Sequence, residues 1–76
     1  MNKRNWLIEI RNSKGLTHQQ VADEVNISRQ YYGMIENGER LPSVDKAKKI
    51  GELLGFDWTI FFENKSYKTL RKTTSA

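Results

Sequence analysis

The stretch that most constrains the fold is residues 17–37, THQQVADEVNISRQYYGMIEN, because it predicts two short helices joined by a tight turn. Thr17 can cap the first helix, and Gln20 stands three residues later, where it completes a capping box. Ser28 can cap the second helix in the same way. Asn26 lies between the two helices and tolerates the left-handed backbone conformation that a sharp corner requires. We therefore expect two helices that cross at a corner near Asn26.

The second of these helices separates into two faces when its residues are placed at about 100° intervals. The side predicted to pack against the rest of the chain holds Tyr31, Tyr32, Ile35 and Glu36. The outward side holds Arg29, Gln30, Gly33, Met34 and Asn37. Arg, Gln and Asn side chains have the donors and acceptors that recognise base edges in a major groove of DNA. A plain solvated face would also be polar, so this pattern alone fits both DNA binding and simple exposure.

Length and composition exclude several classes of protein. A chain of 76 residues is one small domain, and without Cys it has neither disulfides nor a thiol nucleophile. A single His and no plausible cluster of ligands predict no metal site, and we expect no cofactor or small-molecule ligand. No nucleophile–base pair, paired carboxylates or phosphate-binding loop is visible, so the chain is not predicted to be an enzyme. Without an apolar span or signal region, we expect a cytoplasmic, nucleoid-associated protein that does not contact membranes.

The net charge of +4 suits a polyanionic partner, but it is unevenly distributed. Residues 1–14 carry four basic and one acidic side chain, and residues 63–76 carry the same numbers. Residues 15–62, which contain the two-helix stretch, carry five basic and seven acidic side chains. Overall basicity is therefore a poor argument for DNA binding, which has to rest on spacing and on individual charges.

The rest of the chain predicts three further helices and a tail. A helix over residues 2–14 would direct Leu7 inward, and Arg11 beside that face could pair with Glu36, although two separate surface charges would also fit. Ser43 can cap a fourth helix, and Asp57 can cap a short fifth one. We therefore expect an all-α domain over residues 1–62, followed by a basic, flexible tail over residues 63–76.

The fifth helix carries more apolar surface than a small core needs. Trp58, Phe61 and Phe62 are accordingly predicted to form a dimer interface, the alternative being that these residues simply close the core. In the tail, Tyr67 could lie in a short strand that pairs with a dimer mate. The tail could instead follow DNA phosphates through four basic residues, Lys65, Lys68, Arg71 and Lys72.

Taken together, LTHQQVADEVNISRQYYGMIENGERLPS and the later KKIGELLGFDWTIFF resemble the Cro/repressor-type (XRE) helix-turn-helix family over about residues 5–62. The resemblance implies a compact five-helix bundle of the lambda-repressor-like DNA-binding type, with the helix-turn-helix at helices 2 and 3. It also implies a homodimer that binds double-stranded operator DNA in bacteria or phages.

The resemblance assigns roles to individual residues. The positions that face bases are occupied by Ser28, Arg29, Gln30, Gly33 and Met34. The positions that contact phosphates are occupied by Thr17, His18, Gln19, Tyr31, Asn37 and Arg40. Arg11 and Glu36 match a pair that forms a structural salt bridge in several relatives.

Three positions depart from the family pattern. His18 stands where many relatives have Gln, and it could donate to a phosphate or be an ordinary exposed His. Asn26 replaces the usual turn Gly, and Gly51 replaces a usual Ala, which suggests close packing there. Gly33 is also unusual inside a helix, where either a close approach to DNA or a tolerated weakness would explain it.

These observations favour a sequence-specific transcriptional regulator, specifically a repressor that binds a two-fold symmetric operator. The alternative is an antitoxin or another protein-interaction module built on the same fold.

Overall fold

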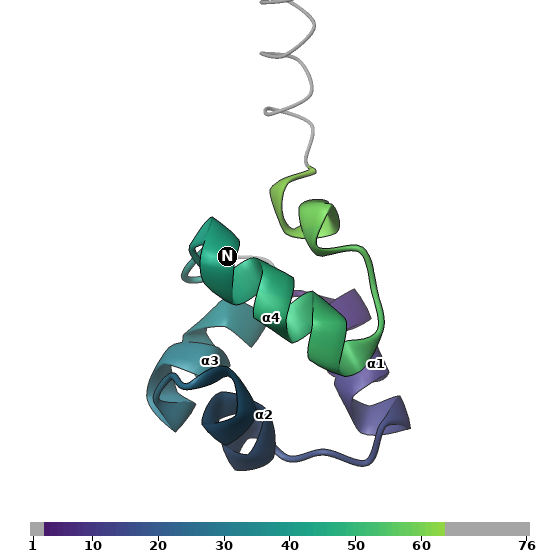
Figure 1. The fold of residues 1–76 in the computed structure, drawn as a ribbon, viewed down its shortest axis with the longest axis vertical. Coiled ribbons are helices and arrows are strands. Elements are labelled where there is room, and N and C mark those ends of the chain that lie inside the picture. Colours follow the sequence, from purple (N-terminus) through teal and green to yellow (C-terminus); the bar gives the residue numbers. More distant parts are fainter. Residues whose placement is uncertain (1–2, 64–76) are drawn as a thin grey trace, which may run out of the picture.

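The computed structural model describes residues 3–63, whose regular elements are all helices. Its α-helices are α1 (Asn5–Ser13), α2 (His18–Val25), α3 (Arg29–Glu36) and α4 (Val44–Leu54), and a 3-10 helix, η1 (Trp58–Phe62), follows them (Figure 1). The predicted all-α class is therefore confirmed. The predicted fifth helix is corrected to a 3-10 turn, a conformation that proteins use in short pieces. Its cap is the Asp57 carboxylate, which accepts hydrogen bonds from the amide and the hydroxyl of Thr59 at 3.0 and 2.8 Å.

The corner between α2 and α3 has the geometry that the sequence predicts. The Gln20 amide donates to Thr17 Oγ1 at 3.1 Å, and the Thr17 amide donates to Gln20 Oε1 at 2.8 Å, so the capping box is complete. Asn26 has the left-handed φ of 64°, and Ser28 Oγ accepts a hydrogen bond from the Tyr31 amide at 3.0 Å. These local features fix where α2 and α3 begin and where α2 ends.

The first helix begins later than predicted. It starts at Asn5 rather than at residue 2, and Arg4 occupies the position before it without capping it through a side-chain hydrogen bond. Arg4 instead extends its side chain to the far end of α3, where it donates to backbone carbonyls. The Arg4 side chain thus makes long-range hydrogen bonds to the end of α3 and the loop after it.

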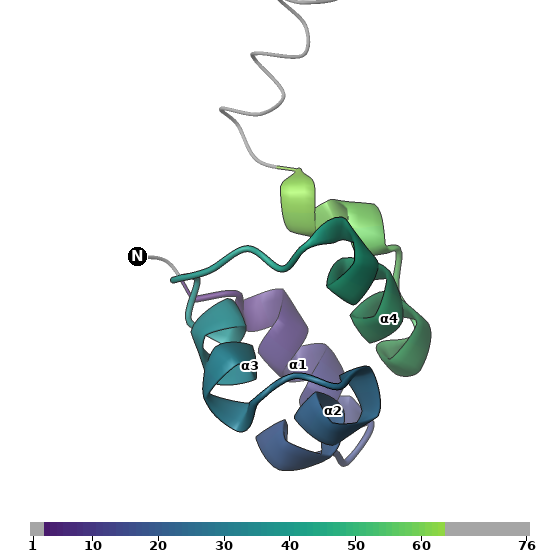
Figure 2. The ribbon, with the colours of Figure 1, turned by 60° about the vertical axis from the view of Figure 1, so that its left-hand side comes forward.

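The core lies where α1, α2, α3 and α4 meet. The apolar side chains buried there are Leu7, Val21, Ala22, Val25, Tyr32, Ile35, Ala47, Ile50, Leu54 and Phe61. α4 crosses the pair formed by α2 and α3, and η1 packs against α4 on the side away from that pair (Figures 1 and 2). Ala22 is fully buried, so its small side chain allows α2 and its neighbours to approach closely.

The turn from α4 into η1 depends on Gly51. A Cβ at this position would lie 2.8 Å from the Phe56 carbonyl oxygen and 3.2 Å from Trp58 Cβ. Because such contacts are too short for an ordinary side chain, the close packing predicted for Gly51 is confirmed.

None of the helices within residues 3–63 has the length and apolar character needed to cross a bilayer. The predictions for the tail, namely its flexibility, the basic arm of Lys65, Lys68, Arg71 and Lys72, and the strand near Tyr67, lie outside the described residues.

Candidate nucleic-acid interface

The residues predicted to face bases lie on the open side of α3. Ser28, Arg29 and Gln30 are exposed at the start of the helix, and Gly33 and Met34 are half-buried one turn later. The opposite side of the helix is buried and holds Tyr32, Ile35 and Glu36. Tyr31, which the sequence places on the packed side, is half-buried. α3 thus has an exposed, mainly polar outer side and a buried inner side that packs against the rest of the domain.

The residues predicted to contact phosphates lie at the start of α2, on α3 and in the loop after α3. Thr17 and Gln19 are exposed at the start of α2, and Asn37 and Arg40 are exposed in the loop after α3. The oxygen of Thr17 is engaged in the capping box, but its hydroxyl hydrogen is free to donate. The Gln19 side chain donates to Asp23 Oδ1 at 2.8 Å, so it would have to rotate to meet a phosphate.

A buried carboxylate joins α3 to α1. Arg11 Nε donates to Glu36 Oε2 at 2.5 Å and Arg11 Nη2 donates to Oε1 at 3.3 Å, so the structure brings the two residues of the predicted salt bridge together. Arg11 Nη1 also donates to the Leu16 carbonyl at 2.8 Å. The guanidinium therefore holds both the end of α3 and the segment that leads into α2.

His18 joins the same carboxylate, a contact that the sequence analysis missed. Its Nε2 lies 2.9 Å from Glu36 Oε1, and its ring packs edge-on against Tyr32 with the centroids 5.5 Å apart. Because an ionised carboxylate only accepts, Nε2 carries the hydrogen of this bond. Only Nδ1 then remains for a phosphate, and it can donate only when the ring is protonated. The amphipathic pattern, which places Glu36 on the packed side in need of donors, was the available signal for this contact.

The opposite charges of Arg11 and Glu36 stabilise one another. Burial alone would raise the pKa of Glu36, but hydrogen bonds from Arg11 and His18, with the Tyr32 hydroxyl close by, outweigh burial and lower that pKa below its usual value. The hydrogen bond with Glu36 likewise raises the pKa of Arg11. Burial and the neighbouring Glu36 charge raise the pKa of Tyr32, whose buried hydroxyl has no hydrogen-bond partner of normal geometry among residues 3–63. Glu36 is therefore held as a carboxylate.

The aromatic residues at the end of the described chain divide into two groups. Phe61 is only 4 % exposed, and its ring packs against Trp6 and Phe56 at centroid distances of 5.3 and 5.6 Å. The structure thus places Phe61 in the core of a single chain, because the edge-on aromatic cluster encloses it, and not on the surface that a dimer interface needs. Trp58 and Phe62 are half-buried and leave apolar surface accessible.

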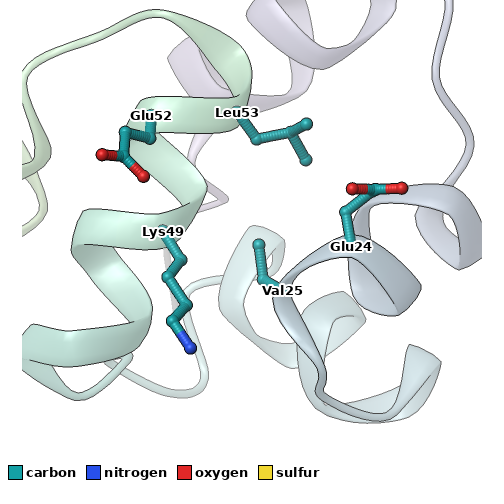
Figure 3. Close-up of a pocket in the computed structure, with 5 residues that line it drawn as sticks. All are labelled: Glu24, Val25, Lys49, Glu52 and Leu53. Atoms are coloured by element: carbon teal, nitrogen blue, oxygen red, sulfur yellow. The ribbon is translucent and has the colours of Figure 1, made fainter.

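A pocket of about 460 Å³ lies between α2 and α4, away from the residues that are predicted to contact DNA. Glu24 and Val25 line it from α2, and Lys49, Glu52 and Leu53 line it from α4 (Figure 3). No residue predicted to contact DNA lines this pocket, and its two carboxylates would repel phosphates. Within the described part of the chain, no three His, Cys, Asp or Glu residues lie together as they would in a metal site.

Comparison with known proteins gives two findings. Residues 7–61 match the helix-turn-helix family HTH_3. The chain is also 61% identical over 61 residues to a Bacillus subtilis (strain 168) protein described as the uncharacterized HTH-type transcriptional regulator YqaF, and the match covers 80% of each chain.

Proposed function

The chain belongs to the helix-turn-helix family of DNA-binding transcriptional regulators, which are not enzymes, and from this premise we propose that it is a repressor that binds a specific operator. The observation that carries the proposal is the division of α3 into two faces. Its inner face is anchored by buried Tyr32, Ile35 and Glu36, while Arg29 and Gln30 stand exposed on its outer face. A rigidly held helix with a free polar side is what insertion into a major groove requires.

In this proposal α3 lies in the major groove. Arg29 reads guanine through two hydrogen bonds, Gln30 reads adenine, and Met34 contacts a thymine methyl group. Ser28 and Gly33 face the bases between them, and Gly33 allows the helix backbone to approach the DNA.

Phosphate contacts fix the position of α3 in the groove. They come from residues at the start of α2, on α3 and in the loop of residues 37–43, which we name the phosphate loop: Thr17, His18, Gln19, Tyr31, Asn37 and Arg40. Of the loop residues, Arg40 is exposed and carries the positive charge.

The operator is two-fold symmetric, and two copies of the chain bind half-sites about 34 Å apart. The dimer forms through the accessible surfaces of Trp58 and Phe62 and not through Phe61, which is buried in the core. Half-buried aromatic side chains are enriched at such interfaces.

The first test is selection of bound sites from a random duplex library, followed by titration of the best site at several salt concentrations. Arg29→Ala should weaken operator binding by about 1–3 kcal/mol and relax the preference at one base pair. Arg40→Ala should weaken binding to all sequences alike and reduce the salt slope by about 1. Lys49→Ala removes the same charge at the pocket between α2 and α4 and is the matched control.

A symmetric consensus with binding far above that of random DNA supports the proposal. Equal losses on operator and random DNA for Arg29→Ala would remove the base-reading role of that residue. Failure to enrich any sequence would overturn operator binding altogether and favour a protein-interaction module.

A further inference from the structure

The end of α3 has an unusual set of hydrogen-bond partners. The last four carbonyls of any helix lack partners within the helix. In α3 the first two of these, from Gly33 and Met34, accept from amides of the following turn at 3.0 and 2.9 Å. The last two also accept from Arg4: its amide donates to the Glu36 carbonyl at 2.8 Å, and its Nη1 donates to the Ile35 carbonyl, which also accepts from the Gly38 amide at 3.2 Å. A residue more than thirty positions earlier in the chain thus completes the end of α3.

The same nitrogen of Arg4 also holds the phosphate loop. Nη1 donates to the Arg40 carbonyl at 3.0 Å, so one atom connects the end of α3 with the loop. Figure 2 shows the start of the described chain running beside the loop that leaves α3. Because the two hydrogens of one nitrogen have fixed directions, Arg4 constrains the separation of these two carbonyls, while the Gly38 and Glu39 amides hold only the start of the loop to α3.

The other side of the Arg4 guanidinium lies over Phe61, with the ring centroid 5.7 Å from Cζ. Phe61 is buried, so the guanidinium rests on the core and has limited freedom to move. The Arg4 guanidinium has no acceptor with which to cap α1, and its hydrogen bonds go to the Ile35 and Arg40 carbonyls. The hydrogen bonds of the Arg4 side chain therefore join α3 to the phosphate loop.

We propose that Arg4 is a positioning residue of the DNA interface: it holds the phosphate loop at a fixed distance from α3, so that Arg40 and the base-reading side chains engage DNA together. This inference rests on the proposed function. Arg4 acts through the loop and does not itself contact a phosphate.

The test is a double-mutant cycle between Arg4 and Arg40, measured as affinity for the selected operator. Arg4→Met removes the side-chain donors, leaves the backbone amide that donates to Glu36, and keeps a side chain that can cover Phe61. We expect Arg4→Met to weaken binding by roughly fivefold to tenfold, the same loss as Arg40→Met, with a salt slope lower by about 1. The double variant should bind no more weakly than Arg40→Met alone.

Two further variants separate positioning from charge. Lys3→Met removes a positive charge from the exposed neighbour of Arg4 and should leave affinity within about twofold of the wild type. Arg4→Lys keeps the charge but loses the planar fork, so it should bind as weakly as Arg4→Met. Wild-type affinity of Arg4→Lys, additive losses in the cycle, or no loss in Arg4→Met would each overturn the proposal.

A measurement without DNA tests the same inference independently of the proposed function. The amides of Gly38 and Glu39 donate to carbonyls of α3 at 3.2 and 2.9 Å, so their hydrogen exchange reports on the start of the loop. In Arg4→Met and in Arg4→Lys these amides should exchange at least about tenfold faster, relative to the Val21 amide in α2, than in Lys3→Met. An equal change at Val21 would mean a general loss of stability and would overturn positioning. If the wild type bound no DNA, the proposed function would fail while this exchange experiment still decided the role of Arg4.

Discussion

Glu36 shows how a single residue can connect structure with function. Its side chain is 2 % exposed, and donors from α1 and α2 converge on its carboxylate. Burying a carboxylate without such partners would be costly, so the contacts determine where α3 sits. Glu36 is also the last residue of α3, which lies next to the phosphate loop. The buried pair therefore orients the helix that we propose reads DNA.

Glu36→Gln should lower the free energy of unfolding by about 3 kcal/mol near neutral pH, because it leaves Arg11 without a charged partner. The pKa of Glu36 is lower in the folded chain than its usual value of 4.5, so this stabilisation is complete above about pH 4.5 and is lost as the pH falls through the folded-state pKa. Urea unfolding of the wild type and Glu36→Gln from about pH 6 to about pH 3 should show their difference shrinking. Glu52→Gln, an exposed control, should have little effect, and a difference that does not depend on pH would contradict the assignment.

The residue contacts differ in how far the sequence predicts them. Arg11 and Glu36 could be paired because the helical pattern places both near packed faces and opposite charges attract. The contacts of Arg4 could not be predicted from the sequence, because they depend on where the end of α3 lies relative to the start of the chain. No local pattern carries that information, and Arg4 counted only as one of several basic residues.

At the scale of elements, α2, α3 and α4 follow their local signals closely. Thr17, Ser28 and Ser43 each cap a helix through the amide three residues later, as predicted. The predicted start of α1 and the predicted α-helical form of η1 were wrong, because contacts with the rest of the chain decide both. Arg4 is drawn to α3, and only five residues follow Asp57 before η1 ends.

Two helical glycines should respond oppositely to the same substitution. A Cβ at Gly33 would meet only His18 Nδ1, at 3.8 Å, so Gly33→Ala should raise the free energy of unfolding by about 0.5–1 kcal/mol. Gly51→Ala should lower it by about 1–3 kcal/mol because the new Cβ would press against Phe56 and Trp58. Thermal and urea unfolding check both values. If Gly33 allows DNA to approach, Gly33→Ala should also weaken operator binding; unchanged binding would mean that this glycine is merely tolerated.

At the scale of the whole molecule, the described chain has a polar surface along α3 and an aromatic surface at η1. Trp58 and Phe62 pack edge-on with ring centroids 6.1 Å apart, and Lys48 Nζ lies 5.3 Å from the Trp58 ring centroid. Both rings remain half-buried. The sequence predicted the surplus of aromatic surface but could not assign each ring to core or surface, because that depends on how η1 turns against α4.

Phe62→Asp should give a folded monomer that binds the operator weakly, because it places a charge in the proposed dimer surface. Phe61→Asp should fail to fold, since it buries that charge in the core. Sedimentation and circular dichroism distinguish these results. Leu41→Asp, at a side chain that is 51 % exposed in the phosphate loop, should leave association unchanged. An unfolded Phe62→Asp, or one that still dimerises, would contradict the proposed interface.

The division of α3 into two faces has a consequence for engineering. The residues that anchor the helix, Tyr32, Ile35 and Glu36, are distinct from the outward residues Arg29 and Gln30. Exchanging the outward residues leaves every anchoring contact in place. In the function that we propose, the target sequence would therefore be changed by rewriting one face of one helix, without redesigning the interior of the domain.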